Sequence, residues 1–303
     1  MKPLELTAGG IATMACLLEV AAPKPGNVHR GADFEDATLV DFMTSAVILG
    51  QTIDQLNERP VGYTIRAAIE ATRLATGTNT NLGMVLLLVP LAKATTNNAG
   101  IIDRNGVGQV LRALDAADAD DVFAAIRFAK PAGLGTVAEM DVRQADSASD
   151  YDLVAAMNLA QDRDLVARQY TNGFAEVFDC GVPWLVDGRS RFRNLTDAIV
   201  FSHVSFMANY PDSLIARKCG EQTAAHSQML AAKALAEINF QAAGREKDPV
   251  NMRQALERFW QGIGELDFWL RSDGHRRNPG TSADLVAASL YVAIQSRKLK
   301  IEH

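Results

Sequence analysis

Alanine and leucine recur at helical spacing along most of the chain, whereas alternating runs of valine, isoleucine and threonine bounded by turns are scarce. This pattern predicts an all-α protein. With 303 residues, of which 48% are hydrophobic, the chain can bury a large core. The predicted helices cover residues 8–22, 38–56, 64–76, 81–95, 107–115, 119–130, 152–178, 195–208, 213–243, 250–270 and 282–296.

The predicted helix at residues 81–95 is apolar on every face. A helix without a polar face is stable only when it is buried, so we expect it at the centre of the fold, with a kink at Pro90. We predict that residues 1–303 form a single domain, a multi-helix bundle around this central helix. Residues 132–150 are the least regular segment, and they are interpreted either as a loop over a pocket or as a plain surface connection.

Composition restricts the class of protein. The formal net charge of -6 argues against a nucleic-acid-binding protein with a broad basic face. The three cysteines are far apart and form no C-x-x-C pair, which favours a reducing compartment. The strongest apolar stretch, residues 84–92, is too short to cross a bilayer. We therefore expect a cytoplasmic protein without a membrane span, and a homodimer is compatible with the sequence.

Three polar blocks that contain glycine interrupt the apolar helices. They are PKPGNVH at residues 23–29, GTNTNLG at residues 77–83 and NPGTSAD at residues 278–284. Each block is followed by a predicted helix, at once or within about ten residues. Free backbone N–H groups at a helix start, together with small hydroxyls, suit a phosphate-bearing ligand.

The first block and the segment after it offer charges of both signs. Lys24 lies between two prolines that hold the backbone extended, so its ammonium could face an anion; the alternative is a solvated lysine in a rigid loop. Asp33, Glu35 and Asp36 crowd three carboxylates into four residues. Such a cluster can bind magnesium through its oxygen atoms, or it can be a solvated acidic turn.

The other blocks allow both functional and structural interpretations. Gly83 would let a ligand, or another backbone, approach the first turn of the central helix. Thr281 and Asp284 are spaced almost as in a capping box, which by itself would explain them. Asp212 precedes a predicted helix and could be an N-cap, a magnesium ligand or both, and Arg217 and Lys218 follow about one turn later.

The order of these blocks resembles the triphosphoribosyl-dephospho-CoA synthase family over about residues 19–294. The resemblance is carried by four motifs. They are Glu19-Val20 followed by Pro23-Lys24-Pro25-Gly26, then Gly77-x-Asn79-Thr80-x-x-Gly83, then Asp212-Ser213 with Ala216, and finally Pro279-Gly280-x-Ser282-Ala283-Asp284-Leu285.

The resemblance implies an all-helical enzyme that transfers the triphosphoribosyl group of ATP to a ribose hydroxyl of dephospho-CoA and releases adenine. It implies a nucleotide triphosphate and a coenzyme-like acceptor as substrates, and Mg2+ as cofactor. The implied catalytic carboxylates are Glu19, Asp36, Asp212 and Asp284, of which Asp36, Asp212 and Asp284 would also bind the metal. The implied substrate-binding residues are Lys24, Gly26, His29, Asn79, Thr80, Gly83, Arg217, Lys218 and Ser282.

The chain departs from the family pattern in the second block. Members of the family usually have Asn-Thr-His-Lys-Gly, whereas this chain has Asn79-Thr80-Asn81-Leu82-Gly83. Its first block and the acidic segment resemble a divergent branch found in archaea and in bacteria with methanopterin-type one-carbon carriers. Three alternatives therefore stay open: an enzyme of methanopterin-type coenzyme biosynthesis, an N-ribosyl hydrolase, and a nucleotide-binding protein without catalysis.

Overall fold

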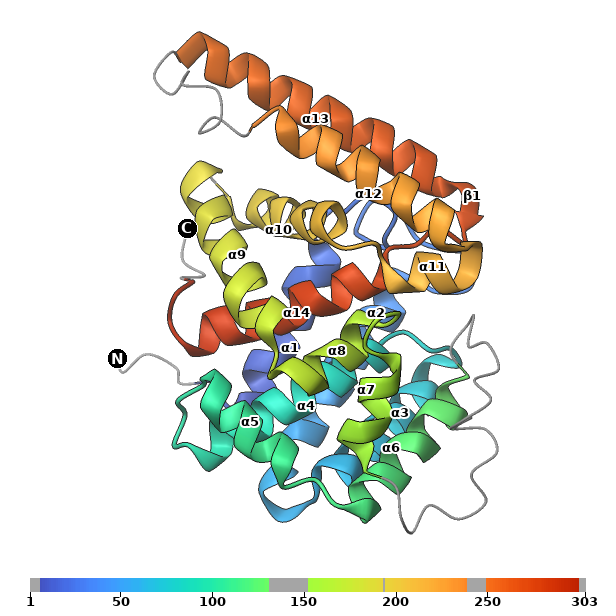
Figure 1. Ribbon diagram of the computed structural model, residues 1–303, viewed down its shortest axis with the longest axis vertical. Coiled ribbons are helices and arrows are strands. Elements are labelled where there is room, and N and C mark those ends of the chain that lie inside the picture. Colours follow the sequence, from blue (N-terminus) through green and yellow to red (C-terminus); the bar gives the residue numbers. More distant parts are fainter. Residues whose placement is uncertain (1–5, 131–151, 193, 239–248, 300–303) are drawn as a thin grey trace.

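The computed structural model describes residues 6–130, 152–192, 194–238 and 249–299. Within these residues the fold is all-α, as predicted, apart from one short strand (Figure 1). The α-helices are α1 Ala8–Ala21, α2 Leu39–Ile53, α3 Val61–Thr76, α4 Leu82–Asn97, α5 Arg104–Arg112, α6 Ala116–Ala129, α7 Leu153–Ala160, α8 Leu165–Asn172, α9 Val182–Arg191, α10 Leu195–Asn209, α11 Ser213–Cys219, α12 Glu221–Ala236, α13 Pro249–Arg271 and α14 Gly280–Gln295. A 3-10 turn, η1 Leu56–Glu58, a π-helical turn, η2 Glu176–Gly181, and the strand β1 Ser272–His275 complete the described elements.

The prediction that the apolar helix is central is confirmed. Every residue of α4 from Met84 to Ala92 is buried, and the helix continues through Pro90. Helices α10 and α14 are buried almost as completely. Helix α14 packs against α1, α4, α9 and α10, and in Figure 1 it crosses the middle of the molecule.

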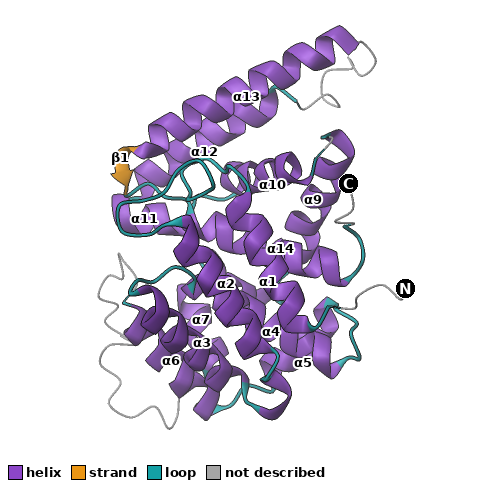
Figure 2. Ribbon diagram, turned by 180° about the vertical axis from the view of Figure 1, so that it is seen from behind, coloured by secondary structure: helices purple, strands orange, loops and turns teal. Residues whose placement is uncertain are grey.

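Two layers flank this centre. On one side α12 and α13 pack along each other, and α12 contacts α10 (Figure 1). On the other side α3 packs against α2, α4 and α6. The connection between α1 and α2 runs beside α11 and β1 in the reverse view (Figure 2), so residues from the first block reach the C-terminal quarter of the chain. None of the helices in the described ranges combines the length and the hydropathy needed to cross a bilayer.

Capping residues set several helix boundaries. Helices α5 and α6 each begin three residues before their predicted starts, because Asp103 and Asp115 accept hydrogen bonds from the first-turn N–H groups of Gly106 and Asp118. Thr38 and Asp41 form a complete capping box at the start of α2. The aspartates and threonines of the sequence therefore act first as helix starts.

Two of the predicted helices are wrong in extent. The predicted helix at residues 152–178 is broken, because Asp164 starts a new helix and Gly173, in the left-handed region at φ 67°, ends it. The predicted helix at residues 213–243 is broken at Gly220, which has φ 91°. Helix α9 was missed. The predicted loop at residues 132–150 lies outside the described residues. So does the last part of the predicted helix at residues 213–243, beyond residue 238.

Candidate functional site

The first turn of α14 is the meeting point of the predicted blocks. Asp212 N-caps α11 through Oδ1, which accepts hydrogen bonds from the N–H groups of Leu214 at 2.9 Å and Ile215 at 3.1 Å. Its second oxygen, Oδ2, accepts from both the N–H and the hydroxyl of Ser282, each at 2.8 Å. The Asp212 carboxylate thus joins the starts of two helices that are 70 residues apart in the sequence.

These four hydrogen bonds decide what Asp212 can do. Burial raises the pKa of Asp212, and the bonds from Ser282, Ile215 and Leu214 work against that rise. Each oxygen already accepts two hydrogen bonds, which leaves little lone-pair capacity for a further ligand. The N-cap interpretation of Asp212 is confirmed, whereas catalysis or metal binding by Asp212 stays a prediction. Ser282, predicted to bind substrate, is a donor to this carboxylate.

Asp284 lies against Gly83, across the contact between α14 and α4. A Cβ atom built on Gly83 would lie 1.9 Å from Oδ2 of Asp284, so only glycine fits at position 83 with the carboxylate where it is. Asp284 is partly exposed and has no hydrogen bond or ion pair with any residue that the structure describes. Burial, with the neighbouring charges of Glu19 and Asp212, raises the pKa of Asp284 well above its usual range.

Glu19 and Lys24 form a buried ion pair beside this carboxylate. Lys24 Nζ lies 2.9 Å from Glu19 Oε1, and both side chains are almost completely inaccessible. The same ammonium donates to the backbone carbonyls of Glu19 and Ala22, at the end of α1. Burial raises the pKa of Glu19, and Lys24 opposes that effect. Lys24 is therefore neither a solvated lysine nor open to solvent, and its phosphate contact stays a prediction.

The remainder of the first block is fixed to the C-terminal part of the chain. The Gly26 N–H donates to Asp267 Oδ1 at 2.7 Å, and Asn27 Nδ2 donates to Asn278 Oδ1 in the third block at 2.6 Å. His29 is partly exposed, and burial together with nearby Arg271 lowers its pKa. The first and third blocks thus touch directly, as a shared site requires.

Asp36 lies at the exposed edge of this region. Its side chain is 63% exposed and its Oδ2 lies 3.4 Å from Nε2 of His275. Phe34 stacks on the same imidazole, with ring centroids 5.0 Å apart. Burial lowers the pKa of Lys218, and the charges of Asp36 and Asp212 oppose that effect. The described contact of the Asp36 carboxylate is therefore with His275 and not with another of the predicted catalytic carboxylates.

Arg217 is held by an acidic partner that sequence reasoning missed. Its Nη1 lies 2.5 Å from Oδ2 of Asp164, and Asp164 also N-caps α8 through its other oxygen. The Nε atom of Arg217 is buried without a hydrogen-bond partner among the described residues. The arginine therefore retains unused donors near Asp284, on whose carboxyl its charge acts.

The second block connects α2, α3 and α4. Thr80 and Ser45 of α2 share a hydrogen bond of 2.6 Å between their hydroxyls. Asn79 is exposed, and its Oδ1 accepts a hydrogen bond from the N–H of Leu82, at 3.3 Å. Asn81 is buried, and its side-chain NH2 group has no partner among the residues described. Asn79 and Thr80 thus brace the start of α4, and their predicted contact with substrate stays a prediction.

Two further buried groups near the ion pair carry no sequence signal of their own. The thiol of Cys16 is buried next to Glu19 and Asp284, and burial and these two charges raise its pKa strongly. His203 of α10 is completely buried, and burial and Lys24 lower its pKa well below the usual range. The ring lies near the backbone of Pro25, but neither nitrogen has a hydrogen bond of good geometry. The lowered pKa favours the neutral form of this imidazole.

The structure thus gathers Glu19, Asp212 and Asp284 and leaves Asp36 at the edge. Within the described ranges, no three histidine, cysteine, aspartate or glutamate side chains are placed to bind one metal ion. Among these carboxylates, Asp284 has the most strongly raised pKa while retaining access to solvent. A partly accessible carboxyl with a raised pKa suits general acid and base catalysis.

Comparisons with known proteins identify a family and a shared fold. A sequence model of the ATP:dephospho-CoA triphosphoribosyl transferase family matches residues 6–303. A crystal structure from Archaeoglobus fulgidus, described as a triphosphoribosyl-dephospho-CoA synthase, is similar with a TM-score of 0.62 and 23% sequence identity. The match covers 84% of this chain and 98% of that chain, and it shows a shared fold. No protein with a curated description matches the chain.

Proposed function

The chain belongs to the ATP:dephospho-CoA triphosphoribosyl transferase family, and on that premise we propose that Asp284 carries the proton in a transfer from ATP to a hydroxyl acceptor. The protein is a transferase. The proposed reaction moves the triphosphoribosyl group of ATP to a hydroxyl of an acceptor such as dephospho-CoA and releases adenine. The observation that carries the proposal is the partly exposed carboxyl of Asp284, which has a raised pKa and no hydrogen-bond partner among the described residues.

The proton balance of the transfer can be met by one group that gives a proton to adenine and then takes one from the acceptor hydroxyl. The bond between ribose C1′ and adenine breaks, and the leaving base takes a proton from the Asp284 carboxyl. The acceptor oxygen then forms a bond to C1′, and its hydroxyl proton returns to the Asp284 carboxylate. A carboxyl whose pKa lies above its usual range is matched to both steps.

The surrounding charges suit the cationic ribose that forms between these steps. An oxocarbenium-like carbon is stabilised by negative charge that is already in place. Glu19 and Asp212 both act electrostatically on Asp284, and hydrogen bonds hold each of them in position. Their proposed role is to stabilise positive charge, and Lys24 favours the ionised form of Glu19 by opposing the rise that burial causes in its pKa.

Magnesium is proposed to bind mainly through the triphosphate of the substrate, with Asp36 as the protein ligand. Mg2+ commonly uses one or two carboxylates together with phosphate oxygens and water. Asp36 has an exposed carboxylate, whereas Asp212 has four hydrogen bonds and Asp284 is assigned to proton transfer. When bound, the ion would neutralise charge on the triphosphate. Asp36→Asn should then raise the magnesium concentration required for half-maximal rate, and Asp284→Asn should not.

The test of the proposed function is adenine release from ATP, measured by chromatography with dephospho-CoA present and then omitted. We expect adenine only when dephospho-CoA is present, and we expect Asp284→Asn to reduce the rate by about 10²–10⁴-fold, the range for general acid–base catalysis. Adenine release without an acceptor would indicate a hydrolase instead. A wild-type rate in Asp284→Asn would remove Asp284 from the mechanism.

A cytoplasmic location is proposed on the basis of cysteine usage. Cys16, Cys180 and Cys219 are all free thiols, as expected where disulfides do not persist. Substrates such as ATP and dephospho-CoA are consistent with the same compartment. Cell fractionation with an antibody against the protein would test this location, and recovery in an extracellular or oxidising fraction would contradict it.

A further inference from the structure

The C-terminal end of α13 holds the first block by its backbone. Residues 24–28 of this block are buried, although they belong to a connection between helices and not to a helix. Buried backbone N–H and C=O groups need hydrogen-bond partners, and a connection has no helical hydrogen bonds to supply them. Two side chains of α13, Asp267 and Arg271, supply partners from 241 and 244 residues further along the chain.

Asp267 and Arg271 bind adjacent residues of the block. Oδ1 of Asp267 accepts hydrogen bonds from the Gly26 N–H at 2.7 Å and from Nε of Arg271 at 2.8 Å. Nη2 of Arg271 donates to the carbonyl oxygen of Asn27 at 2.6 Å. Because residues four apart are neighbours on a helix surface, the two side chains bind each other and the block together. We call Asp267 and Arg271 the α13 clamp.

The backbone of the block at Gly26 fits closely against α13. Gly26 has φ 75°, in the left-handed region that favours glycine. A Cβ atom built on Gly26 would lie 2.8 Å from both Leu270 Cδ1 and Pro279 Cδ. Leu270 belongs to the same end of α13 as the clamp, and Pro279 belongs to the third block. The first block therefore lies directly against both segments, with no room for a side chain at position 26.

The clamped segment joins two parts of the candidate site. On one side of Gly26, the chain runs back to the buried Glu19–Lys24 pair. On the other side, Asn27 Nδ2 donates to Asn278 Oδ1 at 2.6 Å, in the loop that leads into α14. The segment thus lies between the carboxylate at the end of α1 and the helix that carries the proposed proton carrier.

We propose that the α13 clamp is a pair of positioning residues, which fixes the first block so that the Glu19 carboxylate keeps its place beside Asp284 during the transfer. The inference rests on the proposed function, in which the negative charge of Glu19 stabilises a cationic ribose. That positive charge develops only on the way to the transition state. Loss of the clamp should therefore lower kcat and leave KM unchanged.

The first test is the rate of adenine release over a range of ATP and dephospho-CoA concentrations. We expect kcat to fall by about 10–100-fold in Asp267→Ala and in Arg271→Gln, since small displacements of positioned groups have effects of this size. Asp267→Asn retains an oxygen that can accept from the Gly26 N–H, so it should recover part of the rate lost in Asp267→Ala. Arg253→Gln is the matched control, because Arg253 pairs with Glu257 at the same spacing, but at the other, exposed end of α13.

The second test is an NMR titration of His29, which requires no turnover. Burial lowers the pKa of the His29 imidazole, and Arg271 lowers it further. Lys24 and Arg30 act in the same direction, and Asp267 opposes them. We therefore expect a higher pKa of His29 in Arg271→Gln and a lower pKa in Asp267→Asn. A general loosening of the block would reduce burial and raise the pKa in both variants.

The two tests separate this inference from the proposed function. Opposite shifts of the His29 pKa, together with a loss of kcat, support the clamp. A wild-type kcat in both Asp267→Ala and Arg271→Gln, or a change confined to KM, overturns it. Shifts of the His29 pKa in the same direction in Arg271→Gln and Asp267→Asn also overturn it. If the wild type releases no adenine, the proposed function fails, and the His29 titration still decides whether the clamp holds the block.

Discussion

The contact between Gly83 and Asp284 gives the sharpest test of the site. In Gly83→Ala the new Cβ would lie 1.9 Å from Oδ2 of Asp284, whereas ordinary contacts begin at 3.4 Å. The carboxylate must therefore retreat by about 1.5 Å. Displacement of a reacting group by 1 Å can reduce the rate by about 100-fold, or about 2.7 kcal/mol of activation free energy. We expect adenine release to fall by at least this factor.

The same substitution should leave the fold almost unchanged. Alanine is favoured over glycine in a helix by up to about 1 kcal/mol, and an aspartate forced from its rotamer costs a similar amount. These terms nearly cancel, so the thermal midpoint should move by only a few degrees. Gly264→Ala on α13 is the matched control. Its Cβ would meet no atom within 4 Å, so activity should be unchanged and stability slightly higher.

A double-substitution cycle isolates the clash from other effects. If Gly83→Ala acts by moving the carboxylate, it should cause no further loss of rate in an Asp284→Ala background. The assay is the rate of adenine release at saturating substrates, with circular dichroism to verify folding. A wild-type rate in Gly83→Ala, or additive losses in the double variant, would refute the reasoning that places Asp284 at the reacting centre.

Three further predictions concern the buried groups. Lys24→Met should lower the free energy of unfolding by about 3–5 kcal/mol, because Glu19 would be left as an unpaired buried charge; urea denaturation measures this, and a loss below about 1 kcal/mol would contradict it. Asp284 has a raised pKa in the folded state, so the folded protein binds its proton more tightly than the unfolded chain does. The stability that this proton contributes to the fold is fully present below the pKa of the unfolded chain, and it is lost as the pH rises through the pKa of the folded state. Asp284→Asn should therefore be more stable than the wild type at neutral pH, with the difference shrinking towards about pH 4 in thermal unfolding; a constant difference would be inconsistent with the shift. Thr72→Val should raise the free energy of unfolding by about 1 kcal/mol, because the Thr72 hydroxyl is buried without a hydrogen-bond partner among the described residues; an unchanged value in urea denaturation would contradict this.

The sequence alone predicted the helical class and the central helix, because both depend on local patterns. An apolar run such as residues 84–92 can be stable only in the interior, whatever its neighbours are. Asp212 was also recognisable as an N-cap, since the cap and the helix it starts are adjacent in the chain. The breaks at Gly173 and Gly220 were missed, because a single glycine within a periodic pattern is equally compatible with a continuous helix.

The candidate site was predicted as a set of residues but not as an arrangement. Sequence reasoning named Glu19, Lys24, Asp212 and Asp284, and the structure decided what each one contacts. Lys24 was expected to face an anion or solvent, yet it forms a buried ion pair with a carboxylate of its own chain. The burial of this pair depends on how α1 packs against α14, and no local sequence pattern predicts that packing.

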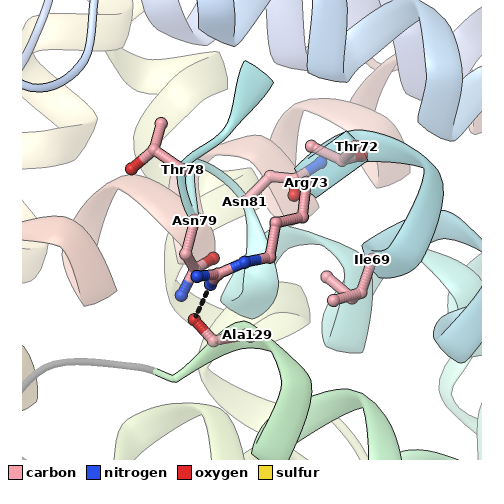
Figure 3. A pocket seen from close by; sticks show the side chains of 7 residues that line it. All are labelled: Ile69, Thr72, Arg73, Thr78, Asn79, Asn81 and Ala129. Atoms are coloured by element: carbon pink, nitrogen blue, oxygen red, sulfur yellow. Dashed lines mark hydrogen bonds between the residues drawn. The ribbon is translucent and has the colours of Figure 1, made fainter. Parts of the chain in front are cut away.

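The tertiary structure alone decided the partner of Arg73. Arg73 lies near the end of an ordinary amphipathic helix, where an arginine is normally a solvated residue. It acquires a defined position only because α6 brings the carbonyl of Ala129 to it (Figure 3). Periodicity and capping determine which helices form, since they act between near neighbours. Pairing between distant residues determines the chemistry, since it exists only after those helices have packed.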